Sequence, residues 1–188
     1  MDVYQNCPVM ESEGFMLRPV EKGDCPDLLR VYSDEKAAAL FNSDNCHGDD
    51  FHYQTPERMA EAIRFWEFSY QNRYFVRWSI VNRKTQEAIG TIEIFRREAE
   101  DFFTDTALLR LDLRSDHERE GVLRELMILI VETAYDLFGC DTITTKAVPA
   151  AETRRRVLEA MGFAESQNTL KGHDGTLYRH YYIRSKNA

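Results

Sequence analysis

A turn suited to holding an anion lies in the stretch SDHEREGVLRELMILI at residues 115–130. Mostly polar residues with a single glycine, Gly121, precede a dense apolar run. The first backbone amides of a helix have no acceptor within the helix and lie at the positive end of its dipole, so they can bind a phosphate. Glycine lets such a group approach the backbone closely. The stretch predicts an anion site or, in the plainer interpretation, only a loop that ends where a helix begins.

The elements on either side would position this turn. Behind it, apolar residues recur at helical spacing from Gly121 to Phe138, and Gly139 is suited to a left-handed helix end. In front of it, residues 106–115 read TALLRLDLRS, in which leucines alternate with polar residues. We therefore expect a strand with one core face and one polar face, leading through the turn into a long helix.

The rest of the chain supplies further strands and helices. Strands are predicted at 15–20, 74–82, 87–95, 142–148 and 175–184, and a loop at 42–53. Helices are predicted after Asp24, whose carboxylate is expected to cap the helix, after Thr55 and over 152–161. The runs at 74–82 and 87–95 should form an antiparallel hairpin. This order predicts an α/β or α+β fold, a mixed and mostly antiparallel central sheet of six to seven strands with helices on both faces.

Composition narrows the class of protein. The chain has 188 residues and a net charge of −8, which argues against nucleic-acid and acidic-membrane partners. The opening MDVYQNCPVMESEG lacks the pattern of a secretory signal, and the longest aliphatic run, LMILIV, falls short of the about 18 residues of a membrane span. We expect a cytoplasmic protein.

The four cysteines lack CxxC spacing, and the spacing of Cys46, His47 and His52 fits no metal motif, so no metal site is predicted.

The order of elements, together with LDLRSDHEREGVLRELMILIVETAYDLFG and RRVLEAMGF, resembles the GNAT superfamily of acetyl-CoA-dependent N-acetyltransferases. The opening FMLRPVEKGDCPDLLRVYSDEKA and the hairpin ending AIGTIEIF are similar to the branch that includes ribosomal-protein N-terminal acetyltransferases. The resemblance runs from Phe15 to Arg184. It implies an N-terminal extension at 1–14 and a single acetyltransferase domain over 15–188.

The resemblance also implies where acetyl-CoA, the co-substrate, would bind. In the family, the turn after the fourth strand carries the signature (Gln/Arg)-x-x-Gly-x-(Gly/Ala), whose backbone amides hold the pyrophosphate. This places the signature over Glu118–Leu123. The implied cofactor-binding residues are Leu111 and Leu113 on the strand, and Arg119, Glu120, Gly121, Val122, Leu123 and Arg124 at the turn.

The chain departs from the signature at both ends. Glu118 replaces Gln or Arg, and a carboxylate repels a pyrophosphate unless it turns away. Leu123 replaces the small residue and narrows the space beside the amides. Arg119 and Arg124 either offset the carboxylate or are simply solvated, and solvation is the plainer interpretation.

A second set of departures lies in VPAAETRRRVLEAMGF. The family usually has Asn at Ala151, often Ser at Arg154 and in many members a general-acid Tyr at Leu158. Arg154 and its neighbours could meet a phosphate or pair with nearby acids, and we favour the second interpretation. These departures leave an alternative open, that the chain is a catalytically degenerate acyl-CoA-binding or partner-binding protein with this fold.

Transfer to an amine needs a group that takes up a proton. Asp112 and Glu93, on neighbouring predicted strands, are the candidate catalytic residues. Each is also a candidate structural ion-pair partner, Asp112 with Arg110 or Arg114. His117 beside the turn is expected at the surface.

The expected acceptor is a primary amine, either a protein N-terminus or a small cationic amine. The acetyl group is expected to pass to it directly, without a covalent enzyme intermediate. The net charge and the acidic segments 44–50 and 98–105 favour a cationic acceptor. A homodimer is a further expectation.

Overall fold

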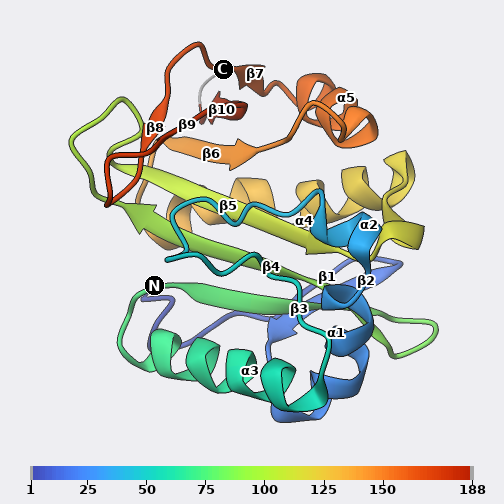
Figure 1. The fold of residues 1–188 in the computed structure, drawn as a ribbon. Coiled ribbons are helices and arrows are strands. Elements are labelled where there is room, and N and C mark those ends of the chain that lie inside the picture. The colour runs from blue at the N-terminus through green and yellow to red at the C-terminus, as the bar shows by residue number, and fades with distance from the viewer. Residues whose placement is uncertain (1, 187–188) are drawn as a thin grey trace.

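A central sheet dominates the computed structural model, which describes residues 2–186 (Figure 1). Its strand order is β1-β2-β3-β4-β5-β6-β10-β7, and β8 and β9 form a separate two-stranded sheet. The strands are β1 (Met10–Glu11), β2 (Phe15–Pro19), β3 (Val76–Asn82), β4 (Ala88–Arg97), β5 (Thr106–Leu113), β6 (Thr142–Lys146), β7 (Ala164–Glu165), β8 (Leu170–Lys171), β9 (Leu177–Tyr178) and β10 (Tyr181–Ser185). In the central sheet β5 and β6 pair in parallel and the other neighbours pair antiparallel, which confirms the predicted mixed sheet.

The sheet has eight strands, one more than the upper end of the prediction. The additional strands are the two-residue elements β1 and β7 at its edges. Strands this short carry too few residues for an alternating pattern to be visible in the sequence.

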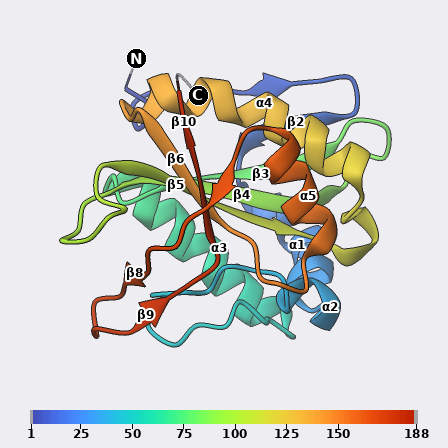
Figure 2. The same ribbon diagram turned by 90° about the horizontal axis from the view of Figure 1, so that it is seen from above.

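Helices cover both faces of the sheet. They are α1 (Cys25–Tyr32), α2 (Glu35–Ala38), α3 (Pro56–Gln71), α4 (Glu120–Phe138) and α5 (Glu152–Ala160). Seen from above, α3 and α4 lie on opposite sides of the strands (Figure 2). The core between α4 and the sheet contains Leu123, Leu126, Met127, Ile130 and Ala134, and a second core contains Leu28 and Tyr32 of α1 with Met59, Ile63 and Trp66 of α3.

Local sequence explains where the two longest helices begin and end. At the start of α3, Thr55 accepts a hydrogen bond from the Arg58 amide and Pro56 takes the first helical position. At the end of α4, Gly139 adopts a left-handed conformation with φ of 60°. These predicted boundaries are confirmed.

No helix in residues 2–186 is long and apolar enough to cross a membrane.

Two local expectations are wrong. The carboxylate of Asp24 does not cap α1; it is buried and accepts hydrogen bonds from Arg18, from Ser79 and from the Glu21 amide. The predicted strand at 175–184 is broken, because His180 has a positive φ of 67°. The chain turns there, so that β9 pairs with β8 while β10 pairs with β6 and β7.

Candidate functional site

The site begins where two parallel strands separate. β5 and β6 pair at Ala107–Ile143, Leu108–Thr144 and Leu109–Thr145. Beyond Leu109, β5 continues to Leu113, whereas β6 ends at Lys146. Within residues 2–186, the last residues of β5 therefore have no partner strand on that side, and their backbone groups need another partner. We call this gap the cleft.

The predicted phosphate turn lies at the end of β5. Arg119 precedes α4 and gives it no side-chain cap, so the first amides of the helix, at Glu120, Gly121 and Val122, are not satisfied by a capping side chain. A Cβ at Gly121 would meet no atom of the described residues within 4 Å, so the turn faces open space. The turn therefore fits an incoming phosphate through its amides and the helix dipole.

The cleft itself is filled by the side chain of Arg154, which enters from α5. Its Nη1 donates to the backbone oxygen of Leu111 at 2.9 Å and to that of Leu40 at 3.3 Å. Its Nη2 forms an ion pair with Glu118. The remaining void is about 10 Å³, bounded by Leu111, Leu123, Met127, Thr145, Arg154, Val157 and Leu158. It is at the limit for even one water molecule, so the pantetheine arm of acetyl-CoA does not fit beside Arg154 in this position.

The other predicted cofactor residues lie as follows. The exposed residues Arg119, Glu120, Gly121 and Arg124 gather with the half-buried Val122 at the start of α4. Leu123 is buried at the side of the cleft, where it narrows the space as expected. Leu111 offers its backbone oxygen to the cleft, whereas Leu113 is buried in the core. His117, expected at the surface, is only 9% exposed and lies beside Arg114, whose guanidinium is 3.1 Å from its Nε2.

The two candidate carboxylates share one arginine. Arg77 of β3 pairs with Glu93 of β4 and, through Nη1, with Oδ2 of Asp112 at 3.0 Å. Arg110 of β5 pairs with the other oxygen of Glu93 at 2.6 Å. Tyr32 donates to Asp112 at 2.7 Å. All five side chains are buried or nearly so.

The expected ion-pair partners of Asp112 are therefore wrong. Arg110 pairs with Glu93 instead, and Arg114 pairs with Asp116. The register explains the first exchange, because Glu93 lies directly opposite Arg110 and also opposite Arg77. Residues opposite one another in an antiparallel pair are closer than residues two apart along one strand.

Burial is the largest influence on the pKa of both carboxyls, and by itself it raises them. At Glu93 the guanidiniums of Arg77 and Arg110 outweigh burial and hold the pKa below its usual value. At Asp112, with Arg77 as its ion-pair partner, burial prevails and the pKa is raised. The same network thus favours the ionised form at Glu93 and disfavours it at Asp112.

A cavity of about 460 Å³ lies beside Glu93. We call it the aromatic pocket; its walls include Phe51, Tyr53, Phe65, Trp66 and Phe75, with Arg58, Arg77, Arg110, Asp49 and Glu93. Arg58 lies 4.3 Å from the Tyr53 ring centroid and Arg77 4.2 Å from that of Trp66. Asp112 does not line the pocket. Of the two predicted carboxylates, only Glu93 lines the pocket, and its side chain is 2% exposed because Arg77 and Arg110 cover both of its oxygens.

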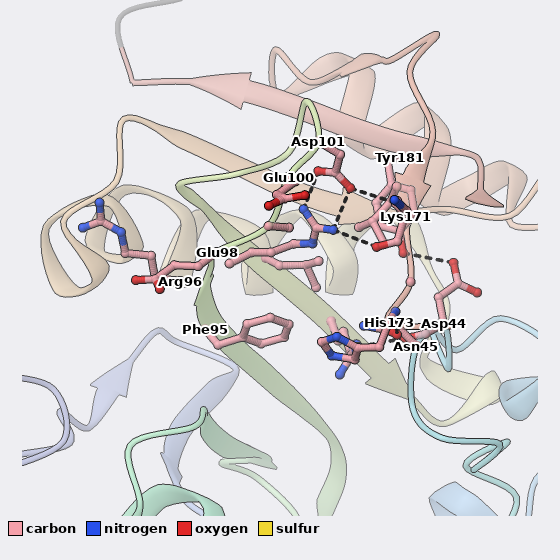
Figure 3. A pocket seen from close by; sticks show the side chains of 16 residues that line it. Asp44, Asn45, Phe95, Arg96, Glu98, Glu100, Asp101, Lys171, His173 and Tyr181 are labelled. Carbon is pink, nitrogen blue, oxygen red and sulfur yellow. Dashed lines mark hydrogen bonds and ion pairs between the residues drawn. The ribbon is translucent and has the colours of Figure 1, made fainter. Parts of the chain in front are cut away.

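A second cavity, of about 410 Å³, lies at the C-terminal end of β4, beside Phe95, Arg96 and Arg97 (Figure 3). Asp101 accepts from the Lys171 amide at one side of it, and Asn45 accepts from the His173 amide at another. Asp44 pairs with Lys146 and accepts from Tyr181, while Asp101 pairs with Arg97. The hydrogen bonds and ion pairs of Asp44 and Asp101 thus hold neighbouring loops together. Within residues 2–186, no group of three or more His, Cys, Asp or Glu side chains is arranged to hold a metal ion.

Sequence reasoning did not assign Arg77 or Tyr32 to the site. Arg77 did give a signal, since it stands inside the apolar run YFVRWSIVN. An arginine in a strand buried on both faces requires an acidic partner. Tyr32 gave no such signal, because it lies on the apolar face of α1, where an ordinary core residue is expected.

The comparisons with known proteins agree with this architecture. A family model described as the acetyltransferase (GNAT) domain matches residues 15–164. The chain is 24% identical over 156 residues to YoaA of Bacillus subtilis (strain 168), described as an uncharacterized N-acetyltransferase, covering 83% of this chain and 82% of that protein.

Two solved structures share the fold. Ribosomal-protein-S5-alanine acetyltransferase from Vibrio fischeri superposes with a TM-score of 0.70 at 16% identity, covering 96% of this chain and 97% of that one. RimJ of Mycobacterium smegmatis, solved in complex with CoA-disulfide, gives a TM-score of 0.67 at 17% identity and covers 94% and 83%. The expected resemblance to ribosomal-protein acetyltransferases is thus confirmed at the level of the fold.

Proposed function

Because this chain belongs to the GNAT family of acetyltransferases, we propose that it transfers an acetyl group from acetyl-CoA directly to a primary amine. The observation that carries the proposal is the separation of β5 from β6, with the uncapped start of α4 at its end. The turn amides would hold the pyrophosphate, and the backbone at Leu111 would align the pantetheine arm. When bound, acetyl-CoA supplies an acetyl group activated as a thioester.

The aromatic pocket is the proposed acceptor site. Leu109 and Leu111 of β5 belong to the core on the α4 side of the sheet, whereas Arg110, between them, lines the aromatic pocket. The alternation of the strand thus puts the pocket on the face opposite α4. The amine would approach the cleft from this face while the co-substrate occupies the other.

Glu93 is the proposed proton acceptor. It lines the pocket, and its lowered pKa keeps it ionised at neutral pH, although the same two arginines make it a weak base. An incoming ammonium group would pass one proton to Glu93, directly or through water, before the nitrogen attacks the acetyl carbonyl. The C–S bond would then break, and the departing coenzyme A thiolate would take up the second proton released by the nitrogen, directly or through water. The proposed role of Asp112 is to hold Arg77, because its carboxylate pairs with that arginine and does not line the pocket.

The pocket favours a protein N-terminus over a small polycationic amine. Three arginines, Arg58, Arg77 and Arg110, line it against two carboxylates, Asp49 and Glu93, each of which already pairs with an arginine. A polyamine would bring further positive charge toward these guanidiniums. A peptide brings a single ammonium group, and its apolar side chains would contact the aromatic walls.

A second candidate function rests on Arg154. Because its side chain fills the cleft, the alternative is a protein with this fold that binds acyl-CoA or a protein partner without turnover. The two candidates differ in transfer and not in fold.

Binding of acetyl-CoA is the first test of the proposed function. Calorimetric titration up to millimolar ligand should give saturable binding that is lost or strongly weakened in Gly121→Glu. The new carboxylate would enter open space at the turn, so repulsion of the pyrophosphate is the expected cause and not misfolding. Gly23→Glu changes another glycine at which a Cβ would meet no atom within 4 Å; this matched control should bind like the wild type. Equal binding by both variants would contradict the assignment of the turn.

A further inference from the structure

The strongest unexplained feature outside the acceptor pocket is the meeting of Arg154 and Glu118. They lie 36 residues apart in the chain, one on α5 and one just before α4. Both side chains are nearly buried, with exposed fractions of 5% for Arg154 and 10% for Glu118. Glu118 and Arg154, two departures from the family pattern, therefore form an ion pair with each other, and each balances the charge of the other.

Arg154 also takes the place of a missing strand. After β6 diverges, the backbone oxygen of Leu111 has no partner in that strand, and the guanidinium supplies one. A second bond, to the oxygen of Leu40, ties the segment after α2 to the same side chain. The guanidinium thus joins three segments across the cleft, those containing Leu40, Leu111 and Glu118.

Stability alone does not explain this arrangement. Desolvation of two charges offsets much of the attraction within a buried ion pair. The Nε of Arg154 is buried and has no hydrogen-bond partner in the described part of the chain, which adds to the cost. An apolar side chain would close the same gap without these costs.

We propose that the Arg154–Glu118 pair is a latch that closes the cofactor cleft, and that Arg154 must leave the cleft before the pantetheine arm can enter. The inference rests on the proposed function, because it takes the cleft to be the acetyl-CoA site. The latch lies where binding can release it. Glu118 directly precedes the turn, so a pyrophosphate at the amides of Glu120 and Gly121 repels its carboxylate and weakens its hold on Arg154.

The cost of the latch is an affinity penalty. When only a fraction of the molecules has an open cleft, the apparent dissociation constant is the intrinsic one divided by that fraction. A latch closed in nine molecules of ten weakens binding about tenfold. Removing it should restore the lost affinity.

Calorimetry with two ligands separates a latch from a phosphate-binding arginine. Coenzyme A carries the phosphates, and pantetheine is the arm without them. Arg154→Ser should bind both ligands about tenfold more tightly or better than the wild type. Glu118→Gln, which frees Arg154 and removes the repulsive carboxylate, should also tighten coenzyme A binding. Arg156→Ser changes an exposed arginine of the same helix and should bind like the wild type.

Each other outcome overturns the proposal in a distinct way. Weaker coenzyme A binding by Arg154→Ser would assign Arg154 to the phosphates. Equal affinities for wild type and Arg154→Ser would show that the side chain moves freely, so the latch would fail while the proposed function stands. No binding by either protein, with melting curves showing both folded, would remove the cofactor site and with it both proposals.

Discussion

At the scale of single residues, the proposed acceptor site depends on the side chain of Arg77. It contacts Glu93 and Asp112 and lies over the ring of Trp66. The same guanidinium therefore joins a carboxylate that lines the aromatic pocket to one that does not. Their positions relative to the pocket, and not their residue type, decide which of them is expected to act on the substrate.

Substitution of the two carboxylates should separate these roles. Glu93→Gln should lower kcat about 100-fold, the range of a lost general base, whereas Asp112→Asn should lower it far less. Both should destabilise the fold by about 3 kcal/mol, since each leaves a buried arginine short of a charge. Steady-state kinetics well below each melting temperature will compare them. Similar losses of kcat in the two variants would contradict the assignment of Glu93.

Asp24 should make the stability of the protein depend on pH. Burial raises its pKa, but the bonds from Arg18, from Ser79 and from the Glu21 amide outweigh burial and leave it below the usual value. A carboxyl with a lowered folded pKa stabilises the fold above its unfolded pKa, and this contribution is lost as the pH falls through the folded value. Asp24→Asn should therefore be about 3 kcal/mol less stable than the wild type at pH 7.

The gap between these two proteins should close at acid pH. The gap should begin to narrow below about pH 4, the usual pKa of an aspartate, and close as the pH falls through the lower folded pKa of Asp24. There the folded wild type loses a charge that the variant does not have. Urea unfolding at pH 7 and at successively lower pH values measures this gap. A gap that does not change with pH would show that the carboxylate charge contributes nothing.

The sequence predicted the candidate carboxylates but not their partners. Asp112 and Glu93 could be selected because they stand on strands, yet partners depend on register, which places Arg77 and Arg110 opposite Glu93. The pairing of Arg154 with an acid was expected, but its identity was not, because Glu118 approaches it only through the tertiary fold.

At the scale of elements, the close approach of β4 and β5 depends on Gly90. A Cβ at this position would lie 2.2 Å from the backbone oxygen of Asp112 and 3.0 Å from Cα of Leu113. Gly90→Ala must therefore push the two strands apart, and we expect a loss of about 3 kcal/mol in the free energy of unfolding. Gly23→Ala, where a Cβ meets nothing within 4 Å, should change it by less than about 0.5 kcal/mol. Urea denaturation of both variants checks the difference, and equal stabilities would contradict it.

Long, periodic elements could be predicted and short ones could not. The helix from Gly121 to Phe138 was predicted to within one residue of α4, because its apolar stripe and Gly139 both mark it. The four-residue helix α2 and the two-residue strands carry no periodicity to detect. The break at His180 was not predictable, because a positive φ at a residue other than glycine has no strong local signal.

At the scale of the whole molecule, the order of helices and strands in the sequence was enough to predict the layered fold. What it could not show is the state of the cleft, since closure depends on a side chain from α5 reaching β5 and the segment after α2. The expected homodimer stays a prediction, and sedimentation velocity should give the mass of two chains if it is right. A single species with the mass of one chain would contradict it.

Acetyl transfer to a peptide is the most direct test of the central claim. Wild-type protein, acetyl-CoA and a peptide with a free N-terminus and an aromatic first residue should yield a peptide heavier by one acetyl group in the mass spectrum. The same peptide with a blocked N-terminus, and spermidine, should remain unmodified. A folded protein that binds acetyl-CoA but acetylates none of these would contradict the proposed activity, and acetylation of spermidine alone would contradict the proposed acceptor.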